Sequence, residues 1–445
     1  MNEEKEPFDF RICARCTGDS FLKSEIERIG EVTDCNYCIF RSPTLFLEKI
    51  AEYVGSAFER LYYLHQDEDG DGEPIVELLQ ERAGVSEKAA GDLRWVLEKM
   101  NYSQDDAING IAQFGEDTLY KLQEEDGGDT FHNWSEFQYS LREEARLFNA
   151  SAAAFLDNVF EGLTGHSTKK GEDVIRPAGP GTDFTHFYRA RSFEKSEDVK
   201  ATLTQPDREL GPPPPEVSGS GRMNVQGISV FYGATTPKTA LAEIRPAVGA
   251  DVLVAKFELL RPLRLLDIES LRRIYVKCSA IDPKYDDHVR RMHFLGYVSQ
   301  LMSAPVLPGR QNMDYIITQG VAEYLANSPG LEIDGLLYPS VQTGDHSLNV
   351  VLFHKASRME LLPPGLSIDP SYGDDFDDER PMYSVVEGKK SDALSRRGID
   401  TRVSYRDYRD KRDHTLRIDR FSIQYHKIKG VEIDSGHYEI KWRQQ

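Results

Sequence analysis

Four of the chain's five cysteines lie within its first 38 residues, and they form two C-x2-C pairs separated by 18 residues. This spacing is typical of a four-thiolate zinc site, because each pair can bind one metal ion from a tight turn. Four thiolates complete a tetrahedron and leave no position for water, so the pattern predicts a structural knuckle of treble-clef or ribbon type. A redox role for either pair is the alternative. The predicted ligands are Cys13, Cys16, Cys35 and Cys38.

The length and charge of the chain limit what else it can be. Its 445 residues predict about two to four domains. The formal net charge of −20 disfavours binding to nucleic-acid backbones, which need a basic surface. The chain shows no apolar run long enough to span a membrane, and its first residues, MNEEKEPFDF, do not resemble a signal peptide. We therefore expect a cytoplasmic protein with no membrane partner.

The cysteine segment, residues 1–42, is followed by a region with helical periodicity, residues 43–165. The stretch SPTLFLEKIAEYVGSAFERLYYLH predicts a helix with Ser42 as its N-cap and Pro43 in its first turn. Arg60 and His65 would both lie on this helix, in an R-x4-H arrangement that HEPN-type ribonucleases also use. The alternative is a surface arginine and a histidine at the end of the helix.

The texture of the sequence changes after a Gly- and Pro-rich linker at residues 166–183. Short runs rich in β-branched and aromatic residues predict strands between residues 184 and 357, and two helices are predicted between them, in TPKTALAEIRP and YIITQGVAEYLANS. The run GPPPPEVSGSG predicts an exposed loop. Residues 358–445 are highly charged and predict a β-rich extension. The predicted fold class is thus multidomain: a zinc knuckle, a helical domain, an α+β domain and a charged extension.

Several polar residues of the α+β domain lie where predicted strands or helices end. Side chains at strand ends can converge on one cleft although they are far apart in the sequence. Alternatively, each of them could be a cap, a turn residue or a surface ion pair. The residues in question are Arg189, Arg222, Asn224, Tyr232, Glu243, Ser340 and Asn349.

Three stretches of this domain resemble the RES domain family, which is named for its Arg, Glu and Ser. They are FYRAR, GRMNVQGISVFYGATTPKTALAEI, and DGLLYPSV followed by LNVVLF. The region before them resembles the HEPN-like domain that precedes RES domains in some bacterial proteins. The resemblance implies a fold like that of diphtheria-toxin-type ADP-ribosyltransferases. It also implies a toxin that consumes NAD+ by hydrolysis or phosphorolysis, or that modifies a macromolecule.

Carried over residue by residue, the resemblance implies a catalytic set of Arg189, Tyr232, Glu243 and Ser340. Arg191 lies on the same strand face as Arg189 and could replace it. From their positions at predicted strand ends and in the glycine-rich loop, we expect Arg222, Asn224 and Asn349 to bind NAD+ together with Arg191.

These observations predict an NAD+-degrading enzyme that acts as a bacterial toxin or an anti-phage defence effector. One alternative is an ADP-ribosyltransferase, and another is a HEPN-type ribonuclease with an inert RES domain. A zinc-ribbon nucleic-acid adaptor is weakened by the net charge. The expected ligands are NAD+ as substrate and a structural zinc ion. The expected partners are an antitoxin or sensor protein and, by analogy with HEPN-like domains, a second copy of the chain.

Overall fold

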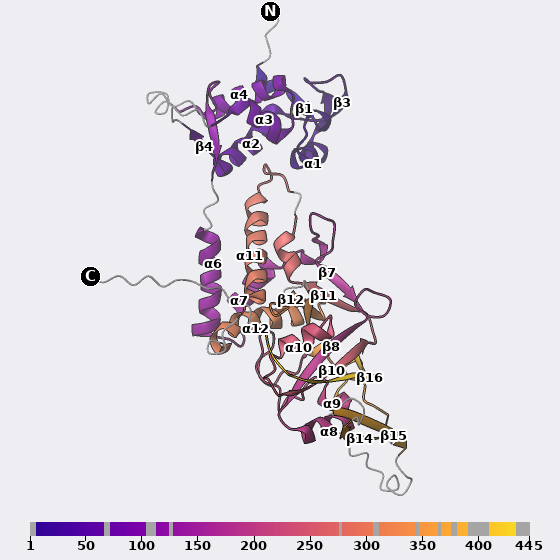
Figure 1. Cartoon of the computed structure of the whole chain (residues 1–445). Coiled ribbons are helices and arrows are strands. Elements are labelled where there is room, and N and C mark those ends of the chain that lie inside the picture. Colours follow the sequence, from indigo (N-terminus) through magenta and orange to yellow (C-terminus); the bar gives the residue numbers. More distant parts are fainter. Residues whose placement is uncertain are drawn as a thin grey trace, which may run out of the picture. The chain divides into compact units, whose positions relative to one another are not determined.

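Figure 1 shows a computed structural model of the chain, coloured along the sequence. The structure describes residues 6–65, 72–103, 113–123, 128–275, 278–305, 311–343, 347–363, 366–374, 381–389 and 409–432. The chain forms two compact units. The first consists of Met1–Asn133 and Val276–His293, and the second consists of Trp134–Tyr275 and Phe294–Gln445.

The first unit contains two small sheets and a group of helices. One sheet has the order β1 (Arg11–Cys13), β3 (Arg41–Phe46), β2 (Glu31–Asp34). The other has the order β4 (Tyr62–His65), β6 (Leu119–Leu122), β5 (Glu73–Pro74). The main helices are α1 (Ser20–Ile29), α2 (Leu47–Leu61), α3 (Ile75–Ala83) and α4 (Glu87–Met100).

The cysteine segment and the helices of this unit share one hydrophobic core. Ile12 and Leu22, from the predicted knuckle, are fully buried in the same cluster as Val54 and Phe58 of α2 and Leu93 of α4. Burying such side chains supplies most of the free energy of folding in a small unit. The predicted boundary near residue 42 therefore does not divide two independent cores.

The predicted start of the first long helix was wrong. Ser42 and Pro43 lie in β3, and α2 begins only at Leu47, without a side-chain cap. β3 is the central strand of its sheet and pairs with both β1 and β2. The hydrogen bonds of two ladders outweigh a local capping signal, which is worth about 1 kcal/mol.

The helical R-x4-H arrangement was also predicted wrongly. Arg60 lies in the last turn of α2, but His65 is the final residue of β4, which pairs with β6. The Arg60 guanidinium donates to the backbone carbonyls of Ala280 and Asp282, each at 3.3 Å, and its Nε lies 3.3 Å from an Asp286 carboxylate oxygen. In this structure Arg60 therefore connects helix α2 with residues 280–286 of the same unit.

The second unit is organised around an eight-stranded sheet with the order β16-β10-β8-β9-β13-β12-β11-β7. All neighbouring strands are antiparallel except β11 and β12. In chain order the strands are β7 (Ile175–Ala178), β8 (His186–Phe193), β9 (Phe231–Ala234), β10 (Asp251–Leu259), β11 (Leu263–Asp267), β12 (Gly335–Pro339), β13 (Leu348–Leu352) and β16 (Leu416–Lys427).

Helices cover both faces of this sheet, because consecutive residues of its central strands, such as β10 and β13, are buried rather than alternately exposed. Leu336 and Val351 face a core built with α6 (Gly128–Tyr139), α7 (Ala150–Val159), α11 (Tyr285–Ser303) and α12 (Gln311–Asn327). The next residues along, Leu337 and Val350, face the opposite core, which includes Val199 of α8 (Ser196–Thr204).

The α+β prediction is confirmed for the strands and for the two helices predicted between them, and the proline run contains no helix or strand. The division of the chain differs from the predicted segments in three places. β7 lies in the predicted linker, α6 and α7 contribute buried residues to the second unit, and Val276–His293 belongs to the first unit.

The described residues of the charged extension are β-rich, as predicted. It forms the hairpin of β14 (Leu366–Asp374) and β15 (Pro381–Lys389), and it supplies β16, the edge strand that pairs with β10. Figure 1 shows β16 beside β10 and the hairpin near α8 and α9 (Pro206–Glu209). Within the described part of the chain, no helix is both long and apolar enough to cross a membrane.

Because β16 completes the sheet, its inward side chains should be essential for stability. We expect Leu416→Ala, at a fully buried position, to lower the free energy of unfolding by about 2–5 kcal/mol. Phe421 lies on the same strand but is 81% exposed, so Phe421→Ala is the matched control and should change stability by under about 0.5 kcal/mol. Urea denaturation of both variants tests this. Equal effects would show that β16 is not part of the cooperative core.

Candidate active site and metal centre

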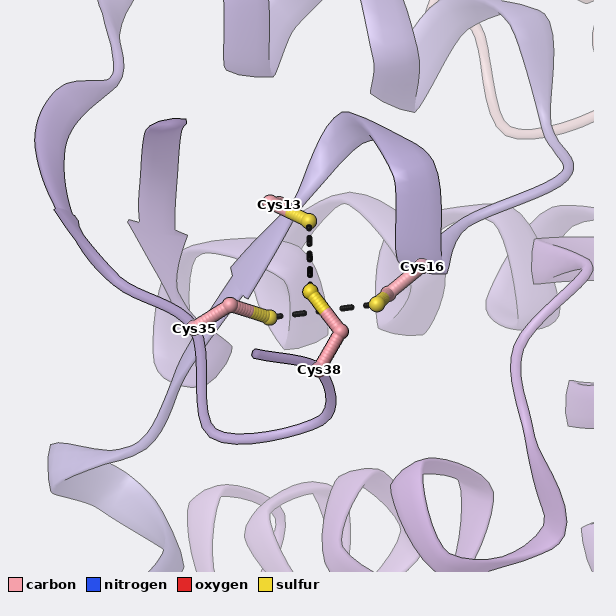
Figure 2. Close-up of side chains that lie close together, drawn as sticks. All are labelled: Cys13, Cys16, Cys35 and Cys38. Atoms are coloured by element: carbon pink, nitrogen blue, oxygen red, sulfur yellow. Dashed lines mark hydrogen bonds between the residues drawn. The ribbon is translucent and has the colours of Figure 1, made fainter. Parts of the chain in front are cut away.

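The four predicted zinc ligands converge in the first unit. Their sulfur atoms all lie within 4.8 Å of one another, with 3.6 Å between Cys13 and Cys38 and 3.9 Å between Cys16 and Cys35. Figure 2 shows the four side chains pointing toward a common centre. A tetrahedral zinc site with Zn–S bonds of about 2.3 Å requires sulfur–sulfur distances of ~3.8 Å. The geometry therefore fits a four-thiolate metal centre.

Short backbone turns place these cysteines. Cys13 ends β1 and Cys16 ends the following 3-10 turn, Ala14–Cys16, while Cys35 and Cys38 lie in the connection between β2 and β3. All four are free thiols rather than disulfides. Burial disfavours ionisation and raises the pKa of Cys16. At Cys13, burial is opposed by hydrogen bonds to the backbone of Arg15 and to Cys38, and the pKa falls to about 7. A divalent cation would favour the thiolate form of the whole set.

The second unit holds a cavity of about 400 Å³ on four neighbouring strands, β8, β9, β13 and β12. The register of these strands brings the predicted residues together. Tyr232 on β9 pairs with Val351 on β13, and Tyr338 on β12 pairs with Asn349 on β13. Arg189 reaches the cavity from β8.

A short helix carries Glu243 into this cavity. Helix α10 (Pro237–Glu243) begins with Thr236, whose side chain accepts a hydrogen bond from the Thr239 amide at 3.1 Å, and with Pro237 in its first turn. Both are strong helix-start signals. Ala240 is buried on one side of the helix, and Glu243 is its last residue. The turn residues thus fix where the carboxylate lies.

The Glu243 carboxylate is held through one of its two oxygens. Its Oε1 accepts hydrogen bonds from the Ser340 hydroxyl at 2.6 Å and from the Asn349 side-chain amide at 2.8 Å. No described residue donates to Oε2. Ser340 and Asn349 are both buried, so these contacts orient the carboxylate while one oxygen stays free for a ligand.

The side-chain oxygen of Asn349 is a second acceptor in this cavity that no described residue uses. It is 3% exposed and lines the cavity, and its Oδ1 has no hydrogen-bond partner among the described residues. A buried acceptor without a partner is costly unless a ligand or water satisfies it. This oxygen is therefore a position for a ligand donor beside Glu243.

Tyr232 is fixed by its hydroxyl group. That hydroxyl donates to Asn224 Oδ1 at 2.9 Å and accepts from the Met223 amide at 3.0 Å. Gly221 is required here, since an added Cβ would lie 2.7 Å from the Tyr232 oxygen. Asn224 does not line the cavity itself. It holds Tyr232 and the loop, with its amide donating to the carbonyl of Gly219 at 3.0 Å.

Two of the predicted arginines line the cavity. One Arg189 nitrogen donates to the Tyr232 carbonyl at 3.2 Å, and one Arg222 nitrogen donates to the Met302 carbonyl at 3.0 Å. Burial, with a smaller contribution from Arg191, lowers the pKa of Arg189 to about 10, so the guanidinium is still charged at neutral pH.

The structure does not bring Arg191 to the cavity. Its guanidinium donates to a Glu209 carboxylate oxygen at 2.8 Å and to the Glu209 carbonyl at 2.6 Å. The prediction that it could replace Arg189 relied on strand alternation alone. β9 pairs with β8 only at Tyr188, so beyond that point the β8 residues meet different neighbours.

Sequence reasoning missed several residues that line the cavity. Tyr188 and Tyr338 stand beside predicted residues on their strands and could have been included on that ground. Ser303 and Tyr315 come from helices α11 and α12, and their contribution depends on tertiary packing that no local pattern shows. Arg245, two residues after Glu243, was also missed.

Comparison with known families supports the assignment of this region. Residues 186–369 match the family model described as RES domain, and the chain therefore contains a RES domain. The match includes Arg189, Tyr232, Glu243 and Ser340. No curated protein matches the chain. The resemblance of the preceding region to HEPN-like domains stays a prediction.

The convergence of four thiols in one core leads to a test of the metal centre. We expect the purified protein to contain stoichiometric zinc by mass spectrometry and Cys35→Ser to lose it. The variant should unfold far more readily, because binding of a structural zinc ion contributes about 10 kcal/mol to folding. Cys278→Ser is the matched control, since Cys278 lies outside the cluster. The assignment would be contradicted if the wild-type protein contained no metal and were no more stable than Cys35→Ser.

Proposed function

We propose that the cavity of the second unit binds NAD+ and cleaves the bond between nicotinamide and ribose. The observation that carries this proposal is the Glu243 carboxylate, which Ser340 and Asn349 hold in a cavity that arginines and tyrosines also line. The RES domain match supports the same reading.

The chemistry of NAD+ explains why one oriented carboxylate is the main requirement. Nicotinamide is bound as a cationic ring and leaves as a neutral one, so its departure needs no general acid. The electron pair of the C1′–N bond leaves with nicotinamide, and positive charge develops on the ribose. A carboxylate fixed beside that charge stabilises the transition state more than the ground state. We assign this role to the free oxygen of Glu243.

The same carboxylate can complete the reaction. Water, a phosphate oxygen or a macromolecular side chain attacks C1′ and forms the new bond. When the acceptor is water, the released proton passes to Glu243. Asn349 Oδ1 and Glu243 Oε2 would hold hydroxyl groups of the ribose. The identity of the ribose product distinguishes hydrolysis, phosphorolysis and ADP-ribosyl transfer.

The rest of the cavity suits the remaining parts of the dinucleotide. The diphosphate is anionic and the chain carries a net charge of −20, so cations must change the sign of the field locally. Arg189 and Arg222 supply them, because a guanidinium can bind phosphate oxygens through two N–H groups. Tyr232, whose ring is oriented by its hydroxyl bonds, would stack on the nicotinamide.

The proposed biological consequence is loss of cellular NAD+. An enzyme that consumes this cofactor without regenerating it arrests growth. We therefore propose a role as a toxin or a defence effector.

The direct test incubates the protein with NAD+, with and without phosphate, and follows nicotinamide release by chromatography. We expect Glu243→Gln to lower the rate about 10²–10³-fold, because the variant keeps the shape of the side chain but loses its charge. Arg191→Ala is the control and should stay within about twofold of wild type, since surface substitutions away from a site have small effects. Wild-type activity in Glu243→Gln would exclude the proposed mechanism.

Substitution of Ser340 or Asn349, the two residues that hold Glu243, should slow the reaction less than substitution of Glu243 itself. Ser340→Ala and Asn349→Ala should each slow nicotinamide release about tenfold, since each removes one hydrogen bond to a charged group. In the double variant, the factor by which nicotinamide release slows should differ from the product of the two single-variant factors, because both groups act on one oxygen. Rates that multiply without interaction would show that the two residues act separately.

A further inference from the structure

Positively charged side chains outnumber negatively charged ones in the lining of the cavity. Three arginines and one glutamate line it. Arg189 and Arg222 each use a nitrogen to bind a backbone carbonyl. Arg245 differs from both. It is exposed, and no described residue accepts a hydrogen bond from its guanidinium or forms an ion pair with it. Arg245 therefore has its full set of donors available at the cavity.

The backbone of Arg245 is strained. Its φ is +45°, in the left-handed region that favours glycine. Pro246 follows it, and a residue before proline ordinarily has a φ near −120°. The other described non-glycine residues with positive φ, Phe114, Phe148 and Glu332, do not line this cavity. An arginine in a conformation that favours glycine costs backbone energy, and residues strained in this way cluster at ligand-binding and active sites.

Its position in the chain ties Arg245 to the carboxylate. Helix α10 ends at Glu243, and the Arg245 amide donates to the Ala242 carbonyl at 3.1 Å, which closes the last turn. The left-handed residue comes directly after this turn. The chain thus presents a carboxylate and a guanidinium to the same cavity within three residues.

We propose that Arg245 is a phosphate-binding residue of this cavity. The inference builds on the proposed NAD+ chemistry and adds a residue that nothing in the RES pattern named. The phosphate group is either part of the dinucleotide's diphosphate or a free inorganic phosphate that acts as the acceptor. Both carry the anionic oxygens that a guanidinium binds through paired N–H groups.

The test measures binding rather than turnover. ADP-ribose carries the diphosphate but no bond to nicotinamide, so its affinity can be measured by calorimetry without catalysis. Inorganic phosphate is titrated separately. The proteins are wild type, Arg245→Ala, Arg245→Gly and the control Arg191→Ala. We expect both Arg245 variants to weaken binding of one probe about tenfold or more, the loss expected for a hydrogen bond to a charged group. Arg191→Ala should bind as wild type does.

The pattern of losses identifies the phosphate source. Loss for ADP-ribose alone assigns Arg245 to the diphosphate, and loss for inorganic phosphate alone assigns it to the acceptor. Affinities for both probes that match wild type in Arg245→Ala would overturn the proposal. If wild type releases nicotinamide while Arg245→Ala retains both affinities, only this inference fails. A wild type that neither releases nicotinamide nor binds ADP-ribose contradicts the proposed function as well.

A second readout separates a binding role from a structural one. Arg245→Gly should unfold at a higher temperature than Arg245→Ala, because glycine adopts a positive φ without the steric penalty. The shift should be about 2 °C for a unit of this size. Both variants should nevertheless lose the same affinity. Lost affinity that glycine restores would show that Arg245 acts through the backbone, and would overturn the proposal.

Discussion

The candidate site depends on the pair of hydrogen bonds that Ser340 and Asn349 donate to one oxygen of Glu243. Both donors are placed by one antiparallel strand pair, in which Tyr338 of β12 is opposite Asn349 of β13. A shift of one residue in that register would turn Asn349 to the other face of the sheet. The core residues on both sides, Leu336 and Leu337, hold the register in place. The orientation of the carboxylate is therefore a consequence of sheet packing.

Charge is the second constraint on this site. A chain with a net charge of −20 repels an anionic ligand on average, so any such ligand needs a local excess of cations. The cavity has that excess, and its arginines differ in how they are held. Arg189 is bound to a backbone carbonyl, whereas Arg245 is exposed on a strained backbone. We infer that the part of the cavity around Arg189 is preorganised, whereas the part around Arg245 is open to solvent.

Much of the fold and site could be predicted because the signals were local. The alternation around Tyr232, the cap and proline that start α10, and the two C-x2-C pairs all act within a few residues. The errors arose where distant contacts decide. Ser42 lies in β3 because that strand pairs with β2. Arg191 forms an ion pair with Glu209 and does not line the cavity. Residues that helices bring to the cavity, such as Tyr315, left no pattern in the sequence.

We infer that Glu243 stabilises positive charge on the ribose during nicotinamide loss. The most direct measurement is the kinetic isotope effect of NAD+ labelled with deuterium at C1′ of the nicotinamide ribose, determined on kcat/KM by competition. A transition state with oxocarbenium character loosens the bending of that C–H bond, so we expect a normal isotope effect, clearly above unity. An effect of one or below would mean that positive charge does not develop at this carbon, and it would contradict the role given to Glu243.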